Sequence, residues 1–470
     1  MTLHALDRHI ALVGFMGAGK TTLAGRLAKR LERPVVDVDR EIERDCGRPI
    51  PRIFAEDGEA GFRSAEARVL ASAIARRHPA VIDVGGGAVT FEENHVALGE
   101  ALTLLVELDV DSAWRRVRHS DRPLAQDHAG FRRLYEERRP LYDAHADAIV
   151  ASGDLDGAVL AAAGVRHEPG ALDRLGELVP GEGPVALVSE PVVLALYGER
   201  ARAALGDRLV STHELPSGEA AKAWPVVQRL WSELALDRDG TIVALGGGAL
   251  TDPAGFAAAT YLRGVTWVAV PTTLVGQVDA AIGGKTAIDI PQGKNLVGAF
   301  HWPARVVIDE SLLETLPERE RRQGLAELLK TRLLAGVELG VRGAAAYKGG
   351  LCLCDPYDRS VRRFLNLGHT FAHALEAAAD FDLPHGEAVA LGLLAALRLS
   401  GRDTSDVESA LDPQPVDVDR DRAWEALQRD KKRAGGEINL VLLSDDGPYV
   451  APRPAAEVRA ALDTLIACKS

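Results

Sequence analysis

The sequence contains few cysteines and no long apolar run. Of its 470 residues, only Cys46, Cys352, Cys354 and Cys468 are cysteines. Their spacing fits neither a disulfide framework nor a zinc ribbon, so we expect reduced thiols in the cytoplasm. A run of about 18 apolar residues, which a membrane span needs, is absent. No secretory leader is expected either, because the first apolar segment, at 10–13, leads directly into a glycine loop.

The composition is that of a soluble globular enzyme. Hydrophobic residues make up 47% and charged residues 26% of the chain, whose length allows two or three domains with separate cores. The formal net charge of −13 argues against a general nucleic-acid partner, while local basic pockets for phosphate remain compatible with it. We therefore expect neither nucleic acid nor a membrane as a partner.

A glycine-rich loop near the N-terminus matches the Walker A pattern in full. The loop follows a short apolar strand at 10–13 and precedes a segment with helical periodicity at 22–30. In such a loop, backbone N–H groups turn inward on phosphates, a lysine reaches the outer phosphates, and a hydroxyl binds Mg²⁺. The pattern predicts a nucleotide site that includes Gly14, Gly17, Ala18, Gly19, Lys20, Thr21 and Thr22.

Charged residues that can select the phosphoryl acceptor follow this loop. Asp37 and Asp39 stand two residues apart after a second apolar strand, and a third strand, at 80–84, leads into three glycines. Carboxylates can hold Mg²⁺ through water or bind hydroxyls, and arginine forks bind carboxylates or a transferring phosphoryl group. The set suits a small, polyhydroxylated acid and comprises Asp37, Asp39, Arg63, Gly85, Gly86, Gly87, Arg122 and Arg138.

Over about residues 8–165, these motifs in this order closely resemble shikimate kinase. The resemblance implies ATP-dependent phosphorylation of shikimate, with Lys20 and Thr21 serving ATP and Mg²⁺ and Asp37 holding the water shell of the metal. Asp39 would bind the shikimate hydroxyls, and Arg122 would come from a mobile lid. The remaining substrate contacts would come from Arg63, Arg138 and the backbone of Gly85, Gly86 and Gly87.

Glycine and proline mark the expected boundary between two halves of the chain. Residues 166–182 contain strong helix and strand breakers, including Pro169-Gly170, and are predicted to form a linker. Beyond them, 185–188 and 241–245 have the pattern of buried strands, and the second leads into a turn at Gly247 and Gly248. A strand that delivers a glycine turn into a helix is the dinucleotide-binding geometry, although the spacing is not G-x-G-x-x-G.

The last third of the chain, from about 312, is predicted to be mostly helical and carries a histidine pair. His369 and His373 stand four residues apart, so on a helix they share one face and both could bind zinc. The alternative for a single helical histidine is a hydrogen-bonded structural residue. The residues alone leave this choice open.

From about 183 to 470, the sequence closely resembles 3-dehydroquinate synthase. The resemblance rests on segments around Pro271-Thr272-Thr273, Lys294-Asn295, Glu327-Leu-Leu-Lys330 and Asn366-Leu-Gly-His369. It implies conversion of 3-deoxy-D-arabino-heptulosonate 7-phosphate to 3-dehydroquinate plus phosphate, dependent on NAD and on Zn²⁺ or Co²⁺. By family analogy, Glu327, His369 and His385 would bind the metal, and His373 would be an acid–base or phosphate-contacting group.

The same resemblance implies the remaining site residues. NAD would be held by Glu219, Lys222, Gly247, Gly248, Asp252, Thr272, Thr273, Asp279, Lys285, Lys294 and Thr315. The substrate would be surrounded by Asp279, Lys285, Lys294, Asn295, Lys330, Lys348, Arg362, Asn366, His373, Lys431 and Lys432. Arg263 would reach in from a neighbouring subunit, which implies a homodimer through this half.

Two departures from the family pattern bear on the activity of the second half. Only residues 331–347 separate Lys330 from Lys348, where the family has several more helical turns, and three glycines interrupt this segment. Asp358 also stands where a glutamate is usual. The alternatives to a dehydroquinate synthase are another sugar-phosphate cyclase and a catalytically inactive NAD- or metal-binding regulator of the kinase.

The predicted fold is α/β throughout its first two parts. A P-loop kinase domain, with a parallel sheet and flanking helices, is expected at 1–165, followed by the linker at 166–182. A Rossmann-like NAD domain is expected at 183–311, and a mostly helical metal-binding domain at 312–470.

Overall fold

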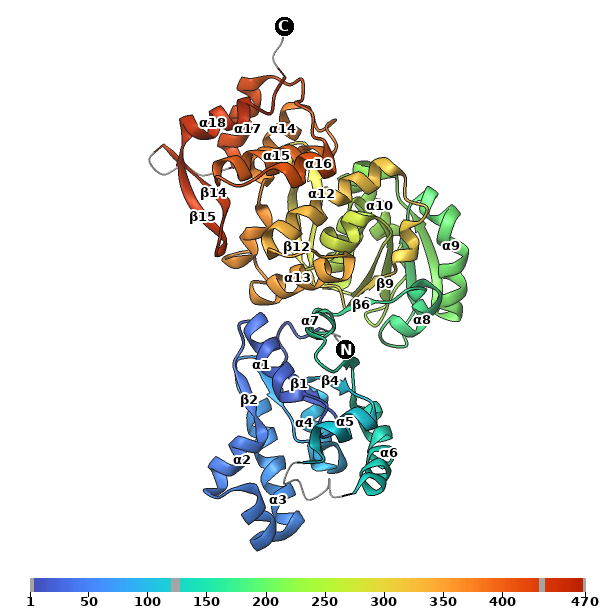
Figure 1. The fold of residues 1–470 in the computed structure, drawn as a ribbon. Coiled ribbons are helices and arrows are strands. Elements are labelled where there is room, and N and C mark those ends of the chain that lie inside the picture. The colour runs from blue at the N-terminus through green and yellow to red at the C-terminus, as the bar shows by residue number, and fades with distance from the viewer. Residues whose placement is uncertain (1–3, 120–126, 431–435, 468–470) are drawn as a thin grey trace. The chain divides into compact units, whose positions relative to one another are not determined.

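The computed structural model describes residues 4–119, 127–430 and 436–467. The chain divides into two compact units after Arg166; Figure 1 colours the first from blue to teal and the second from green to red. Among the described residues, no helix is both long and apolar enough to cross a membrane.

The first unit is built on a five-stranded parallel sheet in the order β2-β3-β1-β4-β5. Its central strands are short and apolar, and all four residues of β1 are buried, as expected for a sheet covered on both faces. The strands are β1 (Ile10–Val13), β2 (Val35–Asp37), β3 (Val81–Asp83), β4 (Leu102–Glu107) and β5 (Ala148–Ala151).

Helices of the first unit connect these strands and share their core. Leu70 and Phe131, from two different helices, are fully buried in the same apolar cluster as Val13 and Ile82 of the sheet. The helices are α1 (Lys20–Arg30), α2 (Val38–Cys46), α3 (Ile50–Ile74), α4 (Glu93–Glu100), α5 (Val110–Val117), α6 (His128–His145) and α7 (Leu155–Ala162).

The second unit has a six-stranded sheet in the order β6-β13-β10-β9-β7-β8. The pairs of β7, β8, β9, β10 and β13 are parallel. Its strands are β6 (Val165–His167), β7 (Val185–Ser189), β8 (Leu209–Glu214), β9 (Thr241–Gly246), β10 (Thr266–Pro271) and β13 (Arg305–Ile308). The helices of this sheet region are α8 (Leu175–Leu178), α9 (Pro191–Leu205), α10 (Trp224–Glu233) and α11 (Gly248–Thr260).

The structure differs from the expected linker at 166–182. Leu172, Leu175 and Leu178 are buried in the core of the second unit, where they pack with Val185 and Leu187 of β7. The prolines and glycines that suggested a linker instead flank two short helical turns, at 171–174 and at 175–178. Proline and glycine indicate where a helix or strand ends, but they do not show whether the residues between them are buried.

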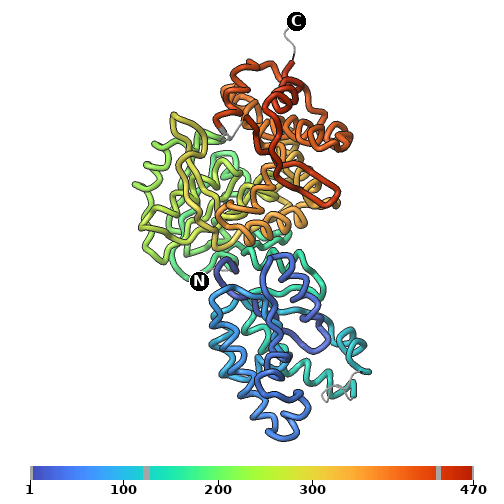
Figure 2. Tube along the Cα trace, turned by 90° about the vertical axis from the view of Figure 1, so that its left-hand side faces the viewer, coloured from blue at the N-terminus to red at the C-terminus, as the bar shows by residue number. Residues whose placement is uncertain are grey.

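The C-terminal part of the second unit is mostly helical, as predicted, but it also contains strands. In the trace of Figure 2, this orange and red part lies beside the green and yellow sheet region. Its helices are α12 (Glu318–Ala335), α13 (Val341–Cys354), α14 (His369–Ala378), α15 (His385–Leu399), α16 (Ser405–Leu411), α17 (Arg420–Asp430) and α18 (Ala455–Asp463). The strands within it form an antiparallel hairpin of β14 (Glu437–Ser444) and β15 (Gly447–Pro454). A second antiparallel hairpin, of β11 (Lys285–Ile290) and β12 (Gly293–Phe300), precedes this part in the sequence, and the sequence analysis predicted neither hairpin.

Candidate functional sites

The Walker loop has a backbone that requires glycine. Gly14, Gly17 and Gly19 take φ values of 144°, 82° and 89°, which side-chain-bearing residues rarely adopt. A Cβ on Gly14 would lie 2.5 Å from the carbonyl oxygen of Val106. The loop therefore keeps its tight path between β1 and α1 only with glycine at these positions.

Lys20 is the first residue of α1 and its side chain lies over the loop. Its Nζ donates to the carbonyl oxygens of Gly14, at 2.8 Å, and Phe15, at 3.4 Å, and the residue is buried. Thr21 and Thr22 lie exposed in the first turn of the same helix. The ammonium group and a hydroxyl thus stand at a helix N-terminus, where phosphate binds favourably.

Two carboxylates end the paired strands β2 and β3, of which β3 lies next to the loop strand β1. Asp37 is the last residue of β2 and caps α2 by accepting from the N–H of Arg40 at 3.1 Å. Asp83 is the last residue of β3, where it is buried and aligned with Asp37 on one side and with Leu12 of β1 on the other. Sequence reasoning selected only Asp37, because sequence alone does not show that β3 neighbours the loop strand.

The residues predicted to bind the molecule that accepts the phosphoryl group converge on the glycines that follow β3. A Cβ on Gly85 would lie 2.7 Å from Oε1 of Glu66 and 3.3 Å from Oδ1 of Asp39, and a Cβ on Gly87 would lie 2.4 Å from Nη2 of Arg63. Arg63 donates to Glu66 at 2.7 Å, and both residues are buried. Burial raises the pKa of Glu66, and Arg63 only partly offsets this.

Arg138 reaches the same glycines from α6. It donates to the carbonyl oxygen of Gly86 at 3.2 Å, and the Tyr142 hydroxyl donates to the same oxygen. Burial raises the pKa of Tyr142 to about 12. Arg122, the predicted lid residue, lies outside the described residues.

The predicted dinucleotide loop leads from β9 into α11. A Cβ on Gly247 would lie 2.9 Å from Cγ2 of Thr273, and one on Gly248 would lie 2.9 Å from the Ala280 side chain. Both glycines are therefore needed for the close approach of this turn to the segment that follows β10. Thr272 is buried there and donates its N–H to Gly246.

Four charged residues predicted to contact NAD form one network, together with Asn295. Nζ of Lys222 lies 2.7 Å from Asp252 and 3.8 Å from Glu219, and it donates to Asn295 at 3.1 Å. Lys294 lies 3.9 Å from Glu219. Burial alone would lower the pKa of Lys222, but Asp252 and Glu219 raise it.

Two predicted residues stand apart from this network. Thr315 makes its hydrogen bond with the Tyr197 hydroxyl, at 2.5 Å. Arg263 is exposed and follows Leu262, and both have left-handed φ values. Its contribution to the site from a second subunit stays a prediction.

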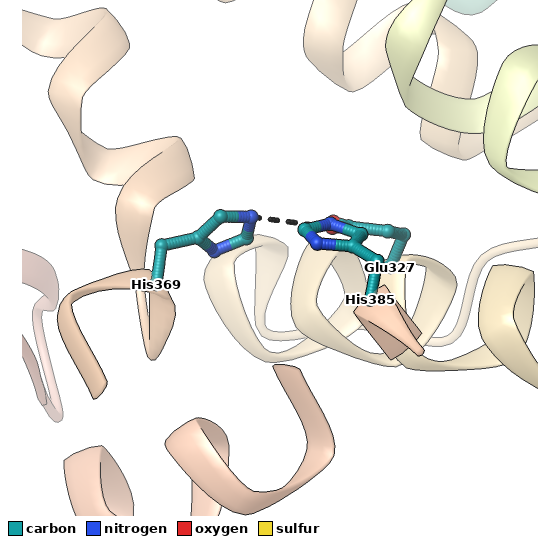
Figure 3. A group of neighbouring side chains, drawn as sticks. All are labelled: Glu327, His369 and His385. Carbon is teal, nitrogen blue, oxygen red and sulfur yellow. Dashed lines mark hydrogen bonds and ion pairs between the residues drawn. The ribbon is translucent and has the colours of Figure 1, made fainter. Parts of the chain in front are cut away.

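Three helices bring together a compact group of potential metal ligands. Glu327 of α12, His369 of α14 and His385 of α15 each offer a ligand atom within 4.8 Å of the others. Nε2 of His369 and of His385 lie 3.2 and 3.0 Å from Oε1 of Glu327. In Figure 3 both rings point toward the Glu327 carboxylate. His373, exposed and 5.5 Å from His369 between ring centroids, is not in this group.

Two buried lysines connect the metal group to Asp279. Nζ of Lys330 lies 2.5 Å from Glu327 and 3.7 Å from Asp279, while Nζ of Lys348 lies 2.8 Å from Asp279. Burial alone would raise the pKa of Glu327, but Lys330 and His369 hold it well below its usual range. Burial lowers the pKa of Lys348 despite Asp279.

Three other residues predicted to contact the substrate, Lys285, Arg362 and Asn366, lie on β11 and on the helical turn at 361–366. Lys285 forms an ion pair with Asp358. A Cβ on Gly283 would lie 2.7 Å from Nη2 of Arg362, which is buried. Asn366 directly precedes the segment that opens α14. Lys431 and Lys432 lie outside the described residues.

Fold and sites together define the class of protein. The first unit is a P-loop nucleotide-binding fold with carboxylate and arginine side chains grouped around the glycine turn after β3. The second combines a glycine turn in a parallel sheet with a glutamate–histidine–histidine group suited to a divalent metal.

Comparisons with known proteins agree with this division. Residues 16–163 match the family model for shikimate kinase, residues 212–323 that for 3-dehydroquinate synthase N-terminal, and residues 305–433 that for 3-dehydroquinate synthase C-terminal. The 3-dehydroquinate synthase of Bordetella pertussis (strain Tohama I) is 39% identical over 337 residues, which cover 63% of this chain and 94% of that protein. The 3-dehydroquinate synthase of Symbiobacterium thermophilum is 39% identical over 325 residues, which cover 60% of this chain and 91% of that protein.

Solved structures resemble the synthase part. The 2-epi-5-epi-valiolone synthase ValA from Streptomyces hygroscopicus subsp. jinggangensis 5008, with NAD⁺ and Zn²⁺ bound, is 27% identical, has a TM-score of 0.53, and matches over 64% of this chain and 96% of that one. A 2-deoxy-scyllo-inosose synthase has a TM-score of 0.56 over 63% of this chain and 95% of that one. At 24% identity, this second likeness concerns the fold alone.

The chain therefore belongs to the 3-dehydroquinate synthase family, and it carries a shikimate kinase domain ahead of the synthase part. It is a bifunctional enzyme of the shikimate pathway, with a kinase and a lyase in one chain.

Proposed function

We propose that the first unit transfers the γ-phosphoryl group of ATP to shikimate and forms shikimate 3-phosphate. The observation that carries this proposal is the convergence of Asp39, Arg63 and Arg138 on the glycine turn beside the Walker loop. The two guanidinium groups suit the carboxylate of the acceptor, and Asp39 suits its hydroxyls.

The nucleotide side of this pocket fits ATP with Mg²⁺. Lys20 and the loop N–H groups would neutralise the phosphates, and a magnesium ion, when bound, would shield the charge that develops during transfer. Thr21, Asp37 and Asp83 would hold that ion, because they combine a hydroxyl with two carboxylates at the ends of β2 and β3.

For the second unit, we propose conversion of 3-deoxy-D-arabino-heptulosonate 7-phosphate to 3-dehydroquinate plus phosphate. The main support for this proposal is the Glu327–His369–His385 group, which lies next to two lysines, Lys330 and Lys348, that pair with Asp279. When bound, NAD would accept and return a hydride, and Zn²⁺ or Co²⁺ would polarise a ring oxygen. Lys330, Lys348 and Arg362 would bind the anionic groups of the substrate.

A second candidate for this unit is another sugar-phosphate cyclase. Two of the solved structures that resemble this part are synthases of 2-deoxy-scyllo-inosose and of 2-epi-5-epi-valiolone. The 39% identity to dehydroquinate synthases exceeds the identity to either and supports the heptulosonate substrate. A third candidate is an inactive regulator that binds NAD or metal.

Phosphate release from candidate substrates separates these functions. The full chain should release phosphate from the heptulosonate 7-phosphate, with catalytic amounts of NAD, and a chelator should abolish the reaction. Release only from sedoheptulose 7-phosphate would replace our proposal by the second candidate. If NAD binds but neither substrate releases phosphate in the presence of Zn²⁺ or Co²⁺, the inactive regulator is the remaining candidate. In that case, binding of NAD or metal should change the rate of shikimate phosphorylation. No transfer of phosphate from ATP to shikimate would refute the kinase assignment.

A further inference from the structure

His385 lies between two carboxylates, only one of which belongs to the metal group. Its Nε2 lies 3.0 Å from Glu327, and its Nδ1 lies 3.0 Å from Oε1 of Glu376. Glu376 belongs to α14, two turns after His369, and its side chain is only 13% exposed. Sequence reasoning did not select it, because no spacing in the sequence places it opposite His385.

The two nitrogens of a ligating imidazole cannot be treated alike. If Nε2 offers its lone pair to a metal, the neutral ring carries its proton on Nδ1, and that N–H needs an acceptor. His369 faces the same requirement, and its Nδ1 lies 3.2 Å from the carbonyl oxygen of Leu367. Each histidine thus has an acceptor at Nδ1 and directs Nε2 toward Glu327.

The acceptors differ in strength. A carboxylate accepts a stronger hydrogen bond than a carbonyl and makes the opposite ring nitrogen a better ligand. Helix packing restrains the His385 ring less than the His369 ring, because His385 is the first residue of α15 and its side chain is 37% exposed. The His369 side chain is 12% exposed.

We infer that Glu376 is a positioning residue that fixes the tautomer and orientation of His385 and thereby the affinity of the metal site. The inference rests on the proposed metal site. Glu376 itself would not touch the metal.

The test measures metal binding by the full chain, apart from turnover. The dissociation constants of Zn²⁺ and Co²⁺ are determined by competition with a chromophoric chelator, and the visible spectrum of bound Co²⁺ reports ligand geometry. Glu376→Gln should weaken both affinities about 10–100-fold and change the spectrum. Glu376→Asp, which keeps the negative charge, should lose less metal affinity than Glu376→Gln. Asp382→Asn removes an exposed charge from the α14–α15 connection and should bind metal like the wild type.

The outcomes separate this inference from the metal site itself. Metal binding by the wild type and its loss in His385→Ala establish the site, and failure of either refutes the proposed metal site. Unchanged affinity and spectrum in Glu376→Gln would then overturn the role of Glu376 alone. Should Glu376→Gln fail to fold, ¹¹³Cd–¹⁵N couplings in the wild type decide. Coupling to Nε2 of His385 is expected, and coupling to Nδ1 would refute the inference.

Discussion

Lys348 contacts Asp279 although only a short turn connects its helix to the preceding one. Its Nζ lies 2.8 Å from the Asp279 carboxylate and donates to the Asp279 carbonyl oxygen at 2.6 Å. Gly336, with a φ of 68°, ends α12, and α13 begins at Val341. The shortened connection therefore still places Lys348 and Lys330 on the same carboxylate, which supports an active second unit.

Lys20→Ala should reduce phosphoryl transfer to shikimate by about a hundredfold or more, because removal of one preorganised electrostatic contact commonly costs this much. Steady-state kinetics with ATP and shikimate measure the effect. Lys29→Ala, an exposed lysine on the same helix, should change little. Equal rates for Lys20→Ala and wild type would contradict the Walker assignment.

Asp37→Asn and Asp83→Asn should each raise the Mg²⁺ concentration needed for half-maximal kinase activity, because each removes one anionic oxygen from the proposed ion site. Calorimetric titration of ADP with and without Mg²⁺ should show a smaller metal-dependent gain in affinity. Asp45→Asn, an exposed control, should behave as wild type. A normal Mg²⁺ requirement in Asp83→Asn would limit the site to Asp37.

Arg63→Ala should weaken shikimate binding while sparing ATP, and it should destabilise the first unit by about 3–5 kcal/mol, because Glu66 is left buried without its partner. The loss should grow with pH. Since burial raises the pKa of Glu66 above 4.5, folding favours its neutral form, and stability falls as pH rises from there through the folded-state pKa. Removal of Arg63 enlarges this effect.

Thermal unfolding of Arg63→Ala between pH 4 and pH 8 checks this expectation. The double variant Arg63→Ala with Glu66→Gln is the matched control and should lose the pH dependence. A destabilisation that is constant over this range would show that the ionisation of Glu66 is not its cause.

His385→Ala should leave the purified protein nearly free of metal, whereas His373→Ala should retain it, because His385 belongs to the ligand group around Glu327 and His373 does not. Metal content after dialysis measures the difference. Loss of metal in His373→Ala with retention in His385→Ala would move the ion to the His369–His373 pair.

A fragment of residues 167–470 should fold and bind NAD, whereas a fragment of residues 183–470 should be much less stable. The shorter fragment lacks Leu172, Leu175 and Leu178, and each buried leucine contributes about 1.5–3 kcal/mol by its burial. Calorimetry and gel filtration compare the two. Equal melting temperatures would show that residues 167–182 are dispensable.

Local patterns in the sequence were sufficient for the elements that carry their own signal. The apolar strands β1 and β9 and the glycines after them were predicted close to their observed bounds, because strand periodicity and glycine turns are local properties. Of the three glycines expected to interrupt 331–347, Gly336 ends α12 and Gly340 precedes α13, but the expectation was wrong for Gly343, which lies within α13. The fold class, which rested on these elements and on the resemblance to the two families, is confirmed by the structure and the similar proteins.

Tertiary structure decided what depends on neighbours distant in the sequence. Residues 166–182 have linker-like breakers, yet Leu172, Leu175 and Leu178 among them are buried in one core with residues of β7 and α9. The sequence allowed a metal site either on the His369–His373 pair or on Glu327 with two histidines. The packing of α12, α14 and α15 brings Glu327, His369 and His385 together. Asp83 and Glu376 have no local motif. Only strand order places Asp83 beside the Walker loop, and only helix packing places Glu376 against His385.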